Sequence, residues 1–229
     1  MNRISPFLKA VAFAAGALCL SPVSLSPVSL FPSEALSEDP APAASPAATK
    51  AGLPSERIRQ VIDDVKTTVT SERGKISEEA LDEKLKVIIL PMFNFEEMSR
   101  RSLGAYWSKG TPEEQREFVK LFSDQLASTY LKRIKRNAED SKITSITDRI
   151  DGEKAMVKSV VLALGEEVAI DYRLILQDGG WSIYDVVIEN VGLVSNYRNE
   201  FPAIIREQGF KGLNQRLREK KIPPPPKSE

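Results

Sequence analysis

Three glycine-containing turns divide residues 142–189 into four runs of strand length, and this pattern constrains the fold more than any other feature of the chain. The turns are Asp151-Gly152, Gly165-Glu166 and Asp178 to Gly180. Such dipeptides at this spacing are typical of β-hairpins. The sequence therefore predicts an antiparallel meander of four strands.

Apolar and polar side chains alternate within these runs, which indicates a sheet with one buried face. In the third run one face is expected to hold Val168, Ile170, Tyr172, Leu174 and Leu176, and the other Glu167, Asp171 and Arg173. In the second run the apolar face is assigned to Met156, Val160, Leu162 and Leu164. We expect these positions to form a continuous apolar wall covered by helices.

Helical patterns stand on both sides of the predicted sheet. One helical face carries Ile58, Val61, Ile62, Val65 and Val69, and Ser77 begins a second helix. Asn94 caps a third helix that ends at Gly104, and Thr111 with Glu114 forms a capping box for a long fourth helix. The stripe of that helix is Phe118, Leu121, Phe122, Gln125, Leu126, Thr129, Tyr130 and Ile134.

These elements predict an α+β fold with helices packed on one face of a curved four-stranded antiparallel sheet. Its folded part is expected at 55–221, after a signal peptide at 1–35 and a disordered linker at 36–54, and before a Pro-rich tail at 222–229. The signal peptide combines Arg3 and Lys9 with a short apolar segment, and small residues precede a cleavage site after Ala35. We expect export across the inner membrane.

Composition excludes several classes of function. The 32 basic residues balance the 32 acidic ones, so the chain has no basic excess that would attract nucleic acid. It contains no His, the usual general base and the commonest metal ligand. The absence of His therefore disfavours most hydrolases and zinc sites but leaves carboxylate chemistry open, and we expect no metal and no cofactor.

Two blocks of sequence carry a family resemblance. They are LGAYWSKGTPEEQREFVKLFSDQLASTYLKRI and IDYRLILQDGGWSIYDVVIENVGLVSNYRNEF. Together they resemble the MlaC family, also called toluene-tolerance proteins, over roughly residues 55–221. Two positions depart from the family pattern: Asn94 stands where an Asp is expected, and ENVGLV stands where EGVSLV is common.

The resemblance implies an NTF2-like, cone-shaped α+β fold that encloses an apolar cavity for lipid acyl chains. It implies a periplasmic phospholipid carrier rather than an enzyme, with an inner-membrane MCE-domain transporter (MlaD-like) and an outer-membrane lipoprotein (MlaA-like) as partners. A hopanoid-associated branch of the family remains an alternative. The lipid-binding candidates are Tyr106, Trp107, Phe122, Tyr130, Leu162, Leu164, Ile170, Tyr172, Leu174, Tyr184, Val187, Val191, Leu193, Tyr197 and Phe201.

Arg198 is the candidate for the lipid head group, because a guanidinium matches phosphate geometry. An ion pair with Glu189 or Asp185 is the alternative for this arginine. The apolar candidates could equally fill a solid core.

Two other classes of function stay open at this point. An enzyme could use Asp171 or Asp185 beside Tyr172 or Tyr184, although strand alternation points Asp171 away from Tyr172. A ligand-free interaction module could dock through the charged helix at 212–221.

Overall fold

The computed structural model describes residues 51–223. The predicted signal peptide, most of the predicted linker and nearly all of the predicted tail lie outside the described residues. Along the chain the elements are α2 (Pro54–Glu72), α3 (Glu78–Ile89), the 3-10 helix η1 (Leu90–Met92), α4 (Phe95–Leu103), the 3-10 helix η2 (Gly104–Lys109), α5 (Pro112–Asn137), β1 (Lys142–Asp151), β2 (Lys154–Ala163), β3 (Glu166–Gln177), β4 (Gly180–Ile188), β5 (Val191–Gly192) and α6 (Leu193–Arg218).

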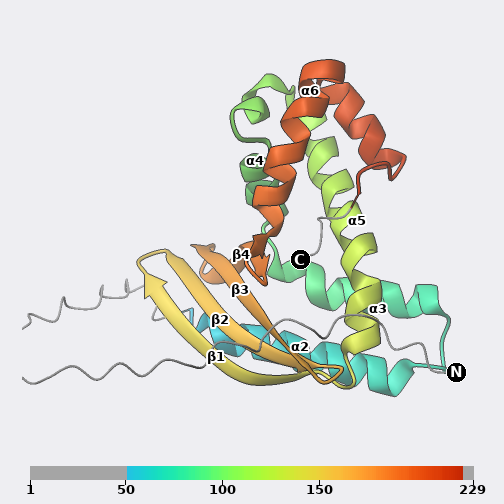
Figure 1. Ribbon diagram of the computed structural model, residues 1–229, viewed down its shortest axis with the longest axis vertical. Helices are drawn as coiled ribbons and strands as arrows, with labels where there is room; N and C mark the ends of the chain where they lie inside the picture. Colours follow the sequence, from blue (N-terminus) through green and yellow to red (C-terminus); the bar gives the residue numbers. More distant parts are fainter. Residues whose placement is uncertain (1–50, 224–229) are drawn as a thin grey trace, which may run out of the picture. The chain divides into compact units, whose positions relative to one another are not determined.

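The strands form one antiparallel sheet in sequence order, β1-β2-β3-β4-β5, and they bend together as Figure 1 shows. The predicted meander and the α+β class are confirmed. The fifth strand is an addition that has only two residues. It arises because Glu189 and Asn190 adopt positive φ angles of 47° and 69°, which turn the chain back onto β4 for two residue pairs before α6 begins.

Cross-strand partners show which side chains share a face of the sheet. Val157 lies opposite Tyr172, and Val161 lies opposite Val168. The apolar face predicted for β3 is therefore the inner face of the sheet. For β2 the prediction is wrong, because the residues assigned to the inner face are those of the opposite parity. The inner residues of β2 are Ala155, Val157, Ser159, Val161 and Ala163, whereas Met156, Val160 and Leu162 point to the opposite face and Leu164 lies 59% exposed in the hairpin turn. Because β2 carries apolar residues at both parities, alternation alone could not select the inner face.

A β-bulge in β4 reverses the alternation along that strand. Arg173 pairs with Asp185, yet the next residue of β3 pairs with Ile183, so Tyr184 is an extra residue. Before the bulge the inner residues are Trp181 and Ile183, and after it they are Val186 and Ile188. The predicted site residues Tyr184 and Val187 consequently lie on the opposite face from these four.

A solid aromatic core joins α4, α5 and α6, which stand side by side in Figure 1. Rings of Phe118, Phe122, Tyr197 and Phe201 pack with centroid separations of 5.1 to 5.6 Å. All four side chains are fully buried. Stacked and edge-to-face pairs of this kind add to the free energy that their burial contributes.

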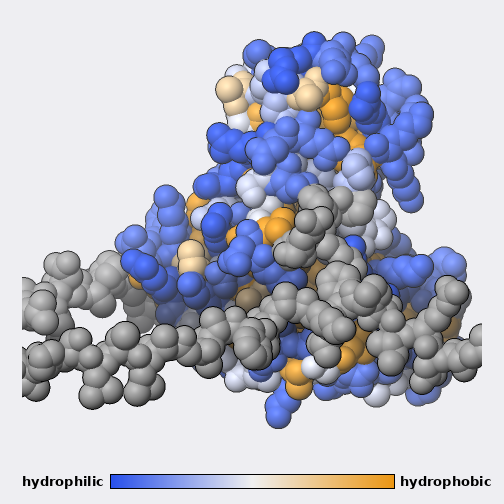
Figure 2. All heavy atoms as spheres, in the orientation of Figure 1, coloured by the Kyte–Doolittle hydropathy of each residue, from blue (hydrophilic) through white to orange (hydrophobic). Residues whose placement is uncertain are grey.

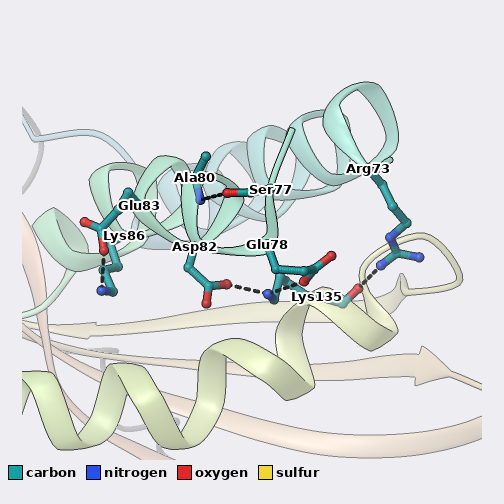
Figure 3. A network of polar contacts seen from close by, with 8 residues as sticks. All are labelled: Arg73, Ser77, Glu78, Ala80, Asp82, Glu83, Lys86 and Lys135. Atoms are coloured by element: carbon teal, nitrogen blue, oxygen red, sulfur yellow. Dashed lines mark hydrogen bonds and ion pairs between the residues drawn. The ribbon is translucent and has the colours of Figure 1, made fainter. Parts of the chain in front are cut away.

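Polar contacts fasten the first described residues and α2 to the sheet. The buried Trp181 donates its indole N–H to the carbonyl oxygen of Gly52 at 3.0 Å, and the backbone N–H of Ser55 donates to Asp148 at 2.9 Å. At the C-terminal end of α2, Figure 3 shows Arg73 donating to the carbonyl of Lys135 on α5, while Lys135 bridges Glu78 and Asp82 of α3. These contacts hold α2, α3 and α5 in a fixed arrangement around one side of the sheet.

The predicted helix caps are confirmed. The side chains of Ser77, Asn94 and Thr111 each accept a backbone N–H three residues on, and Glu114 completes the capping box of α5. No helix within residues 51–223 is long and apolar enough to cross a membrane. Hydrophilic side chains dominate the face of the molecule in Figure 2, where apolar side chains surface only in patches.

Asn94 offers a test of the departure from the family pattern. Its Oδ1 accepts the N–H of Glu97 at 2.9 Å and its Nδ2 donates to Gln177 at 2.6 Å. Asn94→Ala should lower the free energy of unfolding by about 1 kcal/mol, because the cap is lost. Asn94→Asp should stay close to wild type, because an aspartate caps as well and Gln177 can turn its amide to donate. Urea unfolding measures both, and an equal loss in the two variants would contradict the capping role.

Candidate functional site: an apolar cavity

A cavity of about 420 Å³ lies between the inner face of the sheet and the helices α2, α3, α4 and α5. This volume is within the range of pockets that hold small molecules. The sheet contributes Val161, Ala163, Val168, Ile170, Tyr172, Ile183, Val186 and Ile188. The helices and their ends contribute Ile58, Val61, Ile62, Val65, Ile89, Leu90, Met92, Phe93, Phe95, Met98, Leu126, Ala127, Tyr130, Leu131, Ile134, Ala138 and Leu193.

α5 belongs to two environments along its length. Its first half places Phe118 and Phe122 in the solid aromatic core, and its second half borders the cavity from Leu126 to Ala138. The single stripe predicted from the sequence is therefore divided: one part packs on helices, and the other faces open volume. The close aromatic packing holds α5 in place, so that its second half can border volume that no protein atom fills.

Few polar groups reach the cavity. Lys86, Arg133, Asn137 and Ser141 line it, together with the phenols of Tyr130 and Tyr172. Burial raises the pKa of Tyr130 and of Tyr172 to about 12, so both phenols are neutral near pH 7. The surface offered to a ligand is thus overwhelmingly hydrocarbon, and it suits a ligand that is itself hydrocarbon.

The two carboxylates considered as catalytic candidates lie outside the cavity. Asp171 and Asp185 lie on the face of β3 and β4 that points away from the cavity, as their pairing with Lys158 and Arg173 shows. Burial raises the pKa of Asp185, but Oδ1 accepts the N–H of Val194 and Oδ2 pairs with Arg173, each at 3.0 Å. Asp185 therefore anchors the start of α6, and Tyr184 beside it packs under Arg101 of α4 at 4.1 Å. Among residues 51–223 no hydrogen bond joins Asp171 or Asp185 to Tyr172 or Tyr184, the pairs considered from the sequence.

Metal ligands are not gathered in the described part of the chain. Within residues 51–223 no group of three or more His, Cys, Asp or Glu side chains could hold a metal ion.

Four of the predicted lipid-binding residues line the cavity: Tyr130, Ile170, Tyr172 and Leu193. Leu174 is fully buried in the packed core beside Trp181. Val191, opposite Ile188, is half-buried and does not border the volume. On the opposite face of the sheet or in its turn lie Leu162, Leu164, Tyr184 and Val187.

The helical core accounts for most of the remaining candidates. Phe122, Tyr197 and Phe201 are fully buried in it, and Tyr106 and Trp107 pack against it from η2. Arg198 is exposed on α6, where its guanidinium lies beside Gly104. Asp185 pairs with Arg173 rather than with Arg198. The five aromatic residues therefore do not line the cavity but fill or border a solid core, as the alternative interpretation held. The head-group role of Arg198 stays a prediction.

Sequence reasoning missed the helical wall of the cavity. The stripe from Ile58 to Val65 was visible in the sequence, as were Tyr130 and Ile134 on α5. Periodicity shows that such a face is covered, but it does not show whether protein atoms or open volume lie next to it.

The fold and the site define an α+β domain built around an apolar cavity. Residues 59–219 match the family model described as MlaC protein, and the chain belongs to the MlaC family. It is 21% identical over 170 residues to the intermembrane phospholipid transport system binding protein MlaC of Haemophilus influenzae, a match that covers 71% of this chain and 79% of that protein.

A solved structure is similar as well. It is a phospholipid-binding protein from Ralstonia solanacearum in complex with a phospholipid, with 28% identity and a TM-score of 0.63. The match covers 74% of this chain and 97% of that one. The family predicted from the two sequence blocks is therefore confirmed.

A variant at Tyr197 tests whether this residue belongs to the solid helical core or to the cavity. Its hydroxyl is buried without a hydrogen-bond partner among the described residues, and its burial raises the pKa of the phenol. Tyr197→Phe removes an unsatisfied group, so the free energy of unfolding should stay unchanged or rise by about 1 kcal/mol. Thermal and urea unfolding measure this, and lipid content should not change. A clear loss of bound lipid would return Tyr197 to the site.

Proposed function

We propose that the protein binds phospholipid through its acyl chains in the apolar cavity and carries it between membranes. The observation that carries this proposal is the lining of the cavity, where hydrocarbon side chains from the sheet and the helices surround about 420 Å³ and no carboxylate of residues 51–223 takes part. The names of the relatives in Haemophilus influenzae and Ralstonia solanacearum support phospholipid as the ligand.

The energetics suit a carrier. Each methylene removed from water contributes about 0.8 kcal/mol, so acyl chains inside the cavity would not escape into solution. A chain in a bilayer is already in an apolar medium, however, and its transfer into the cavity changes the free energy little. A protein of this kind can load and unload at membranes without an energy-consuming step of its own.

The cellular route is part of the proposal. The predicted signal peptide would deliver the protein to the periplasm, between an inner-membrane transporter with an MCE domain and an outer-membrane lipoprotein. The word intermembrane in the name of the Haemophilus influenzae protein supports this location. N-terminal sequencing of the exported protein tests the cleavage after Ala35.

Organic extraction of the purified protein followed by mass spectrometry tests the ligand. A carrier should contain close to one lipid molecule per chain, and the masses separate phospholipid from the hopanoid alternative. A protein that is free of lipid when purified from the periplasm, and that takes up none from vesicles, would instead support a ligand-free interaction module.

Two adjacent valines on β2 provide a matched pair of variants. Val161 lines the cavity, while Val160 points to the opposite face of the same strand, and both are half-buried. Val161→Trp should fill the cavity and strongly reduce bound lipid, at a cost in unfolding free energy below about 1.5 kcal/mol, because open volume accepts the ring. Val160→Trp should retain the lipid of the wild type.

Lipid per chain by mass spectrometry and a thermal melt are the two measurements for this pair. A Val161→Trp protein that folds and holds as much lipid as Val160→Trp would sink the assignment of this cavity as the binding site.

A further inference from the structure

Among residues 51–223 the charged side chains that line the cavity are those of Lys86 and Arg133, both cations, and no acidic side chain of this range lines it. Lys86 donates to Glu83 at 2.6 Å, as Figure 3 shows. Arg133 takes part in none of the ion pairs that form within residues 51–223. Arg133 therefore brings a positive charge without a carboxylate partner to the border of the apolar volume.

The position of Arg133 is that of a side chain between water and hydrocarbon. It is exposed, and its guanidinium carbon lies 5.7 Å from the centre of the Tyr130 ring, which lines the cavity. An arginine in this setting lays its methylenes along apolar surface and holds its guanidinium in water. The tyrosine ring restricts where that guanidinium can go.

Asn137 is a second polar group without a partner at the same place. It lies four residues after Arg133 on α5, so the two side chains are neighbours on one face of the helix. Asn137 lines the cavity, and its Oδ1 is buried with no hydrogen-bond partner among the described residues. A buried amide oxygen without a donor is unfavourable, and a ligand that brings a donor would satisfy it.

We propose that Arg133 binds the phosphate of the lipid whose acyl chains occupy the cavity, and that Asn137 accepts a hydrogen bond from its polar head. This inference rests on the proposed function and names the polar half of its ligand. A guanidinium presents paired N–H donors that match two phosphate oxygens, and none of the described residues brings a carboxylate to the lining to compete for it. The site accordingly selects lipids that carry a phosphate over neutral lipids with the same chains.

Vesicles of equal parts phosphatidylglycerol and diacylglycerol with identical acyl chains provide the test. Wild type, Arg133→Gln and Arg136→Gln are incubated with these vesicles, separated from them by gel filtration and analysed for bound lipid by mass spectrometry. Arg136 is the matched control: it is also an exposed arginine on α5, but it borders a polar hollow facing α3 and not the apolar cavity.

Wild type and Arg136→Gln should be enriched in phosphatidylglycerol over diacylglycerol. In Arg133→Gln the ratio of bound phosphatidylglycerol to bound diacylglycerol should fall about tenfold, the size expected for one charge-assisted hydrogen-bonded contact. Its total bound lipid and melting temperature should stay near wild type. Arg133→Lys should keep part of the preference, because a cation remains without the paired donors. In wild type the preference should also weaken as salt is added.

Results that contradict the phosphate site differ from results that contradict lipid binding. A wild-type preference in Arg133→Gln, or an equal loss in Arg133→Gln and Arg136→Gln, overturns the phosphate site but leaves acyl-chain binding intact. Lipid on none of the three proteins overturns the proposed function itself.

Discussion

The bulge in β4 is the constraint on which the arrangement of sheet, cavity and helical core depends. One extra residue at Tyr184 lets Trp181 and Ile183 face inward before it, while Asp185 points outward after it. The outward Asp185 then accepts the N–H of Val194 at 3.0 Å and fixes the first turn of α6. If the same sequence alternated regularly through Tyr184 with no bulge, Asp185 would share the inner face with Ile183, and the start of α6 would lack this acceptor. The bulge thus keeps the Asp185 carboxylate out of the cavity and places it where it caps the start of α6.

An open cavity needs walls that do not collapse onto each other, and this molecule holds its walls from two sides. The aromatic core of α4, α5 and α6 fixes the first half of α5 with packed rings. Lys135, half-buried near the other end, bridges Glu78 and Asp82 and ties α5 to α3 (Figure 3). The segment of α5 that lines the cavity lies between these two attachments. Its side chains therefore border unfilled volume without drawing the helix against the sheet.

The sequence predicted the elements well because their signals are local. Turn dipeptides fixed the hairpins, and Ser77, Asn94 and Thr111 marked helix starts through contacts only three residues long. The family was equally readable from two blocks of sequence. The faces were harder, because Val160 and Val161 are both apolar and the bulge at Tyr184 breaks any count of alternate residues. Most of all, a stripe such as Phe118 to Ile134 has the same pattern whether it meets a ring or a void, so the cavity wall could not be separated from the solid core.

The chemistry of the lining also determines where specificity can come from. Hydrocarbon walls discriminate lipid from water, but they distinguish one acyl chain from another only weakly, since each methylene contributes the same small amount. They do not favour the protein over a bilayer, because both offer an apolar medium. Selectivity among lipids must then reside in the few polar groups at the border of the cavity. Within residues 51–223 the polar groups of the lining are Lys86, Arg133, Asn137, Ser141 and two neutral phenols. Of these, only Arg133 combines a full charge, exposure to water and freedom from an ion pair, so it is the position at which this protein can recognise more than hydrocarbon.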